Sequence, residues 1–159
     1  MSDDSTKIID ADGHIAGRLC SQISKLLLNG NRVIVVNAEK ALISGGKKSI
    51  IRENDERLEI RSSTHPKHGP FHPRKPDNYL SKMVRGMLPR NKPSGRAAQK
   101  RLRVYVSIPK EYQNSDKITF QNLKATKHFN FYTSMFICSL LSKLESEVML
   151  ATPMSYRLH

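Results

Sequence analysis

The stretch Arg32-Val33-Ile34-Val35-Val36-Asn37 contains a run of β-branched residues with no polar alternation. Such a run is typical of a strand that is covered on both faces, as in a parallel sheet. A second short apolar run precedes it at Lys7-Ile8-Ile9-Asp10. Between the two, apolar residues recur at helical spacing: Ile15, Leu19, Ile23, Leu26 and Leu27. The first third therefore predicts a strand–helix–strand unit and an α/β fold with a mostly parallel sheet.

The rest of the chain has weaker patterns of helix and strand. The patterns predict a surface helix over 47–60, an irregular stretch over 62–76, helices over 78–88 and 95–102, strands over 104–108 and 129–132, and a helix over 134–144. Four prolines account for the irregular stretch, and Asp77 is a suitable N-cap for the helix that follows it. We expect one domain over 1–159, with a core at about 6–61 and 103–144, a basic arm at about 62–102 and a tail at 145–159.

Positive charge is concentrated in one part of the chain. The net charge is +13, and residues 65–110 hold 12 of the 27 Lys and Arg residues but only one of the 14 acids, Asp77. The isoelectric point is about 10.0. A charged surface in contact with solvent usually mixes both signs, so this imbalance predicts a polyanionic partner, most often the phosphate backbone of a nucleic acid.

Other classes of protein fit the sequence less well. No apolar run approaches the ~18 residues that a membrane-spanning helix needs, and the polar, acidic segment 1–6 is not a secretory signal. Cys20 and Cys138 fall within apolar helical patterns and are expected to be buried thiols. We therefore expect a soluble, cytoplasmic protein with neither a membrane partner nor a small-molecule substrate.

Folded RNA suits the basic arm better than DNA does. The sequence holds no helix-turn-helix, zinc-finger or basic-zipper pattern with which to read a major groove. An irregular segment rich in Arg, Lys, His and Pro favours recognition of RNA by shape. His65, His68 and His72 lie among prolines, far in sequence from either cysteine, and are expected to bind phosphates or stack on bases rather than hold a metal. No cofactor is expected.

An enzyme is the less favoured alternative. Gly45-Gly46-Lys47-Lys48-Ser49 resembles part of a phosphate loop, but Ala41 stands where the first glycine belongs and Lys48 where Ser or Thr should follow. The sequence also lacks a Gly-x-Gly-x-x-Gly motif and an evident pair of nucleophile and base. Lys47 and Lys48 at a helix N-terminus, and Arg18 on the polar side of the first helix, remain candidates for phosphate contacts.

Several ordered motifs carry a resemblance to a known family. Asp12-Gly13-His14-Ile15-Ala16-Gly17-Arg18-Leu19 and Val33-Ile34-Val35-Val36-Asn37-Ala38-Glu39 resemble the opening of the universal large-subunit ribosomal protein thirteen family. Gly69-Pro70-Phe71-His72-Pro73-Arg74-Lys75-Pro76 and Val84-Arg85-Gly86-Met87-Leu88-Pro89 resemble its central signature. Lys92-Pro93-Ser94-Gly95-Arg96 and Arg101-Leu102-Arg103-Val104-Tyr105 are similar to its archaeal and eukaryotic branch.

The resemblance implies a three-layer α/β/α fold and a protein that organises large-subunit rRNA early in assembly, beside neighbouring ribosomal proteins, without chemistry of its own. An RNA-binding translational regulator acting off the ribosome would need the same basic arm, so that alternative stays open. Gly86 and Gly95 are expected to let phosphate approach the backbone. The expected rRNA contacts are Arg18, Lys47, Lys48, Lys67, His68, His72, Arg74, Lys75, Lys82, Arg85, Arg90, Lys92, Arg96, Lys100 and Arg101.

Overall fold

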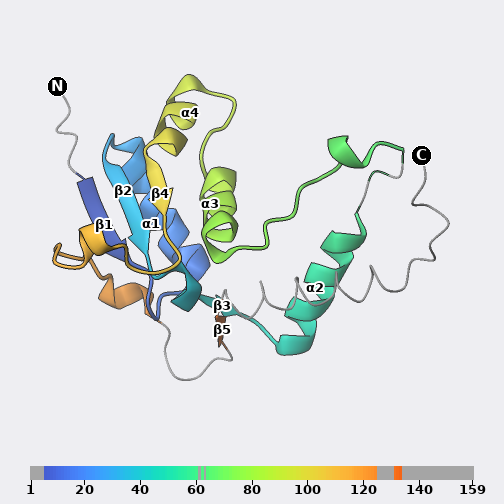
Figure 1. Cartoon of the computed structure of the whole chain (residues 1–159), viewed down its shortest axis with the longest axis horizontal. Coiled ribbons are helices and arrows are strands. Elements are labelled where there is room, and N and C mark those ends of the chain that lie inside the picture. The colour runs from blue at the N-terminus through green and yellow to red at the C-terminus, as the bar shows by residue number, and fades with distance from the viewer. Residues whose placement is uncertain (1–5, 61, 63, 125–130, 134–159) are drawn as a thin grey trace.

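The fold is organised around a parallel sheet (Figure 1). The computed structural model describes residues 6–60, 62, 64–124 and 131–133. The strands lie in the order β1 (Thr6–Asp10), β2 (Arg32–Val36) and β4 (Leu102–Val104), and both pairings are parallel. β2 is central, with Val33 to Val36 all buried, as its unbroken apolar run predicts. The predicted α/β fold with a mostly parallel sheet is confirmed.

One face of the sheet is covered by helices α1 (Ala16–Leu28), α3 (Pro76–Met87) and α4 (Pro93–Lys100). Their apolar sides share a single core with β2, to which Leu19, Leu80, Val84 and Ala98 contribute. On the opposite face, Ile8, Ile34 and Val36 are covered by Tyr105, Ile108 and Tyr112 from the segment after β4. That segment includes a short 3₁₀ turn, η3 (Lys110–Tyr112).

The predicted basic arm is therefore divided between two environments. Its helices α3 and α4 pack into the core, so they are built into the fold as well as carrying charge. Residues 64–75, which include the 3₁₀ turn η2 (Pro66–His68), run with α2 (Lys47–Glu59) to one side of the sheet (Figure 1). The division between core and arm stays a prediction, but α3 and α4 belong to the helical layer.

Several element boundaries differ from the prediction. β4 ends at Val104, well short of Ile108, because its partner β2 ends where Asn37 turns into the left-handed region at φ 57°. α3 is capped at Lys75 with Pro76 in its first turn, so the prediction of Asp77 as the N-cap was wrong. Proline suits this position because a first-turn residue has no intrahelical acceptor for its N–H.

A second, small sheet was not predicted in full. β3 (Leu42–Ser44) pairs in antiparallel fashion with β5 (Phe131–Thr133). The expected strand over 129–132 overlaps β5, whereas nothing in the three-residue stretch of β3 distinguished it from a loop. η2 also adds a regular turn within the stretch expected to be irregular. The helix expected over 134–144, with Cys138, and the tail over 145–159 lie outside the described residues.

The turn between β1 and α1 is held by hydrogen bonds of His14 and Asp10. His14 is fully buried; its Nδ1 lies 2.9 Å from the carbonyl oxygen of Asp12, and its Nε2 lies 3.1 Å from the backbone nitrogen of Phe120. Asp10 Oδ1 accepts hydrogen bonds from the backbone N–H of Asp12 and from Asn37 Nδ2. The ring of His14 therefore links the start of α1 to a segment more than a hundred residues away in sequence.

Candidate nucleic-acid interface

α3 presents one face to the core and another to solvent. Leu80 and Val84 are buried, while Lys75, Lys82 and Arg85 are exposed. Lys82 and Arg85 are three residues apart in the helix and share a face that points away from the core, and Lys75 precedes the helix as its N-cap. The burial of the apolar side thus fixes the direction in which the cationic side points.

α4 repeats this arrangement on a shorter scale. Lys92, Arg96 and Lys100 recur every four residues and are exposed, and Ala98 faces the core. Arg96 donates a hydrogen bond to the preceding loop, from its Nε to the carbonyl oxygen of Arg90 at 3.4 Å. Arg90 is also exposed. The two helices together display six exposed cations on a rigid support.

The two glycines of this region have different roles. Gly86 is exposed, with nothing within 4 Å of where a Cβ would stand, so close approach of a phosphate there stays a prediction. Gly95 is buried, and a Cβ on it would stand 2.6 Å from the carbonyl carbon of Pro89. The expectation that Gly95 faces phosphate was wrong, because its open side is filled by the chain's own backbone.

The loop before α3 carries both charge and an aromatic ring. Lys67 and His68 are exposed in η2, and Arg74 is exposed just before α3. His72 is half-buried. Phe71 is 78% exposed, and the carbonyl oxygen of the same residue accepts a 3.3 Å hydrogen bond from Lys82 Nζ. A large exposed ring among cations is an arrangement that suits stacking on an unpaired base.

The remaining predicted contacts lie elsewhere on the surface. Lys47 and Lys48 are exposed at the start of α2, which Figure 1 places at the opposite end of the molecule from α4. Arg18 is exposed on α1, on the polar side that its spacing predicts. Lys47 and Lys48 are therefore separate from the surface formed by α3 and α4, whereas Arg18 lies on α1, which packs against both of these helices.

Arg101 serves the fold directly. It is half-buried, and its Nη2 donates a 2.9 Å hydrogen bond to the carbonyl oxygen of Leu27 in the last turn of α1. The same helix end is closed by Gly30, whose φ of 95° is left-handed, and by Asn31 Nδ2, which donates to the carbonyl of Leu26. A cation at a helix C-terminus also interacts favourably with the helix dipole.

We therefore expect Arg101→Gln to lower the free energy of unfolding by about 1–3 kcal/mol, because it removes a charge-assisted hydrogen bond from a partly buried carbonyl. Arg96→Gln is the matched control, since it removes the same charge from an exposed position on α4. Urea denaturation followed by circular dichroism measures both. Equal losses in the two variants would contradict the capping role of Arg101.

The sequence is similar to known proteins over much of the chain. A family model for ribosomal protein L13 matches residues 4–111. The chain belongs to the ribosomal protein L13 family.

Archaeal relatives in the L13 family are similar over most of their length. A large ribosomal subunit protein uL13 from Methanococcoides burtonii is 44% identical over 120 residues, which cover 76% of this chain and 84% of the relative. Relatives of the same name from Archaeoglobus fulgidus and Pyrobaculum islandicum are 46% and 47% identical, covering 73% and 76% of this chain and 72% and 67% of their own lengths. The predicted family and branch are confirmed.

The sequence patterns did not predict every residue that the structure places on or beside α3 and the loop before it. Phe71 was part of the recognised signature but not of the predicted contacts, although an aromatic residue between two prolines in a basic segment is a usable signal. Asn54 and Arg57 on α2 lie beside Tyr79 of α3 around a cavity, and no local pattern indicates such proximity.

Neither a metal cluster nor a membrane helix is found in the part of the chain that the structure describes. No group of three or more His, Cys, Asp and Glu residues within those residues is arranged to hold a metal ion. None of the helices described is both long and apolar enough to cross a bilayer. Burial raises the pKa of the Cys20 thiol to about 12, which keeps the buried thiol protonated and unreactive.

Proposed function

We propose that this chain is a structural constituent of the large ribosomal subunit, which binds and organises large-subunit rRNA and joins the particle early in assembly. The observation that carries this proposal is the exposed cationic face of α3 and α4, whose opposite side is part of the core. Membership of the L13 family supports it, since the relatives bear the name of a large-subunit protein.

The mechanism follows from how the charges are supported. Cations on a flexible segment of chain can meet phosphates in many arrangements. Cations on two helices that pack into the core have a fixed spacing and therefore favour one arrangement of RNA strands. Lys82 and Arg85 on α3 follow the basic loop 64–75, which ends at Lys75. RNA strands that converge on this surface no longer repel one another, because the protein replaces their counterions.

The proposal requires stable association with the large subunit. In a sucrose gradient of cell extract, we expect the chain to migrate with large subunits and to remain there after a high-salt wash. A translational regulator acting off the ribosome would instead appear in the light fractions. Recovery of the chain in the light fractions alone would overturn the structural role.

Salt dependence tests the phosphate contacts independently. If the six exposed cations of α3 and α4 each contact one phosphate, log affinity for the rRNA should fall against log salt with a slope of about −4 to −5, since each contact contributes roughly −0.7 to −0.9. Filter binding of the purified chain to transcribed large-subunit rRNA measures this slope. The KCl concentration is varied from 50 to 500 mM, a range of about one decade. A nearly flat dependence would exclude this surface as a phosphate site.

A further inference from the structure

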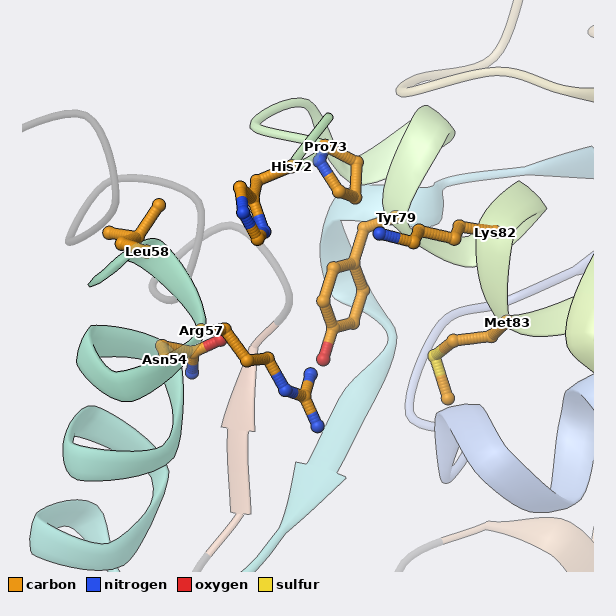
Figure 2. A pocket seen from close by; sticks show the side chains of 8 residues that line it. All are labelled: Asn54, Arg57, Leu58, His72, Pro73, Tyr79, Lys82 and Met83. Atoms are coloured by element: carbon orange, nitrogen blue, oxygen red, sulfur yellow. The ribbon is translucent and has the colours of Figure 1, made fainter. Parts of the chain in front are cut away.

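A cavity lies between α2 and α3 (Figure 2). Its volume is about 160 Å³. Asn54, Arg57 and Leu58 line it from α2, and Tyr79 and Lys82 line it from α3. Positions spaced three and four residues apart share a helix face, so each helix turns one continuous face toward the cavity.

The lining combines polar and apolar groups in the way that ligand sites do. The loop before α3 adds His72 and Pro73, and α3 adds Met83. Within the described residues, Nε2 of His72 is buried and has no hydrogen-bond partner. Buried polar atoms in proteins nearly always have a partner, and Nε2 of His72 is free to bond to a polar group that enters the cavity.

The charge of the lining selects the kind of ligand. Arg57 and Lys82 are both exposed and both reach the cavity, and no acidic residue lines it. Asn54 Nδ2 donates a 2.7 Å hydrogen bond to the carbonyl oxygen of Ile50, which orients the amide and leaves its oxygen as an acceptor. The site thus offers hydrogen-bond donors and acceptors, aromatic rings and two cations.

The size of the cavity restricts the ligand further. A cavity of roughly 150 Å³ holds one six-membered aromatic ring, whereas pockets for whole drug-sized ligands span about 300–1,000 Å³. A planar ring fits inside, and a sugar and phosphate attached to it must remain at the rim, where Arg57 and Lys82 lie. A nucleotide joins a planar polar base to a phosphate through its sugar, and so meets both requirements.

We propose that this cavity receives a single unstacked base of the large-subunit rRNA, with its flanking phosphates held by Arg57 and Lys82. The inference rests on the proposed function. Two features favour RNA over a side chain of a neighbouring protein: the cationic rim continues along α3 to Arg85, and the exposed ring of Phe71 offers a second stacking surface nearby in sequence. Sequence-specific RNA recognition commonly uses bases splayed out of a helix and stacked on aromatic side chains.

Filling the cavity without changing any charge gives the sharpest test. Leu58→Trp places a large ring at a lining position, and Ser49→Trp is the matched control, because Ser49 is an exposed, neutral residue on another face of α2. The full chain is bound to transcribed large-subunit rRNA, and base-specific chemical probing maps protected nucleotides. We expect Leu58→Trp to weaken binding roughly 5- to 100-fold, the range for losing one base stacked on an aromatic ring, and to expose one base that the wild type protects.

The salt slope of Leu58→Trp should stay close to that of the wild type, since every cation of the chain is kept. His72→Leu provides a second variant if Leu58→Trp does not fold, as judged by its thermal unfolding, and it should expose the same base.

Wild-type affinity and an unchanged protection pattern in either folded variant would overturn the proposal. Normal binding to bare rRNA but poor incorporation into assembled subunits would also overturn it, in favour of a protein side chain. Failure of the wild type to bind rRNA would instead contradict the proposed function.

Discussion

Replacing His14 with Ala should lower the free energy of unfolding by about 3–5 kcal/mol, the range for truncating a large buried side chain. The ring is fully buried. Its Nδ1 lies 2.9 Å from the carbonyl oxygen of Asp12, and its Nε2 lies 3.1 Å from both the backbone nitrogen and the carbonyl oxygen of Phe120. The alanine variant therefore leaves a cavity and removes the partners of two backbone groups.

Guanidinium denaturation, followed by circular dichroism, measures this loss. His68→Ala is the matched control, because His68 is exposed in η2 and its removal should leave the stability nearly unchanged. His14→Phe separates the two contributions, since it keeps most of the volume but not the hydrogen bonds. A loss below about 1 kcal/mol for His14→Ala would show that the junction of β1 and α1 does not depend on this ring.

The sequence predicts the sheet well where the pattern is local and strong. The run from Val33 to Val36 indicates a strand buried on both faces, and the residues between the strands follow helical spacing, so β1, α1 and β2 are all confirmed. Where an element ends depends on its partner. β4 stops at Val104 because β2 has already turned at Asn37, and no property of the sequence near Ile108 reveals this.

The candidate site likewise has features that the sequence predicts and features that depend on distant parts of the chain. Charge alone identified the basic segment, and the structure places Arg85 of this segment on the exposed side of α3. The cavity between α2 and α3 is lined by residues such as Arg57 and Tyr79, which are far apart in sequence and on separately predicted helices. Arg101 illustrates the converse case, because composition does not distinguish a cation that caps α1 from one that meets solvent.

Reversing two charges on the exposed face of α3 should weaken rRNA binding far more than any neutral change. Lys75 and Arg85 are both exposed, and neither lines the cavity between α2 and α3. Hydrogen bonds to charged groups contribute about 1.5–3 kcal/mol each, so the combined Lys75→Glu and Arg85→Glu variant should lose roughly two to four orders of magnitude in affinity. Repulsion between the new carboxylates and phosphate adds to this loss.

The fold should tolerate both changes. A glutamate at position 75 lies at the N-terminus of α3, where negative charge is favourable, and one at position 85 lies in its last turn, where it costs about 0.3–1 kcal/mol. Near-native thermal unfolding would therefore show that lost affinity comes from lost phosphate contacts.

Lys25→Glu with Lys40→Glu is the matched control, since both lysines are exposed and both lie outside the basic segment. It changes the net charge by the same amount, so it separates the position of a charge from its effect on the total. If the α3 face binds phosphate, only the first pair should reduce the log–log salt slope, by about 1.4–1.8 for two contacts. Equal loss of affinity in both pairs would mean that RNA responds to the overall charge of the chain and that the spacing of cations on α3 has no part in recognition.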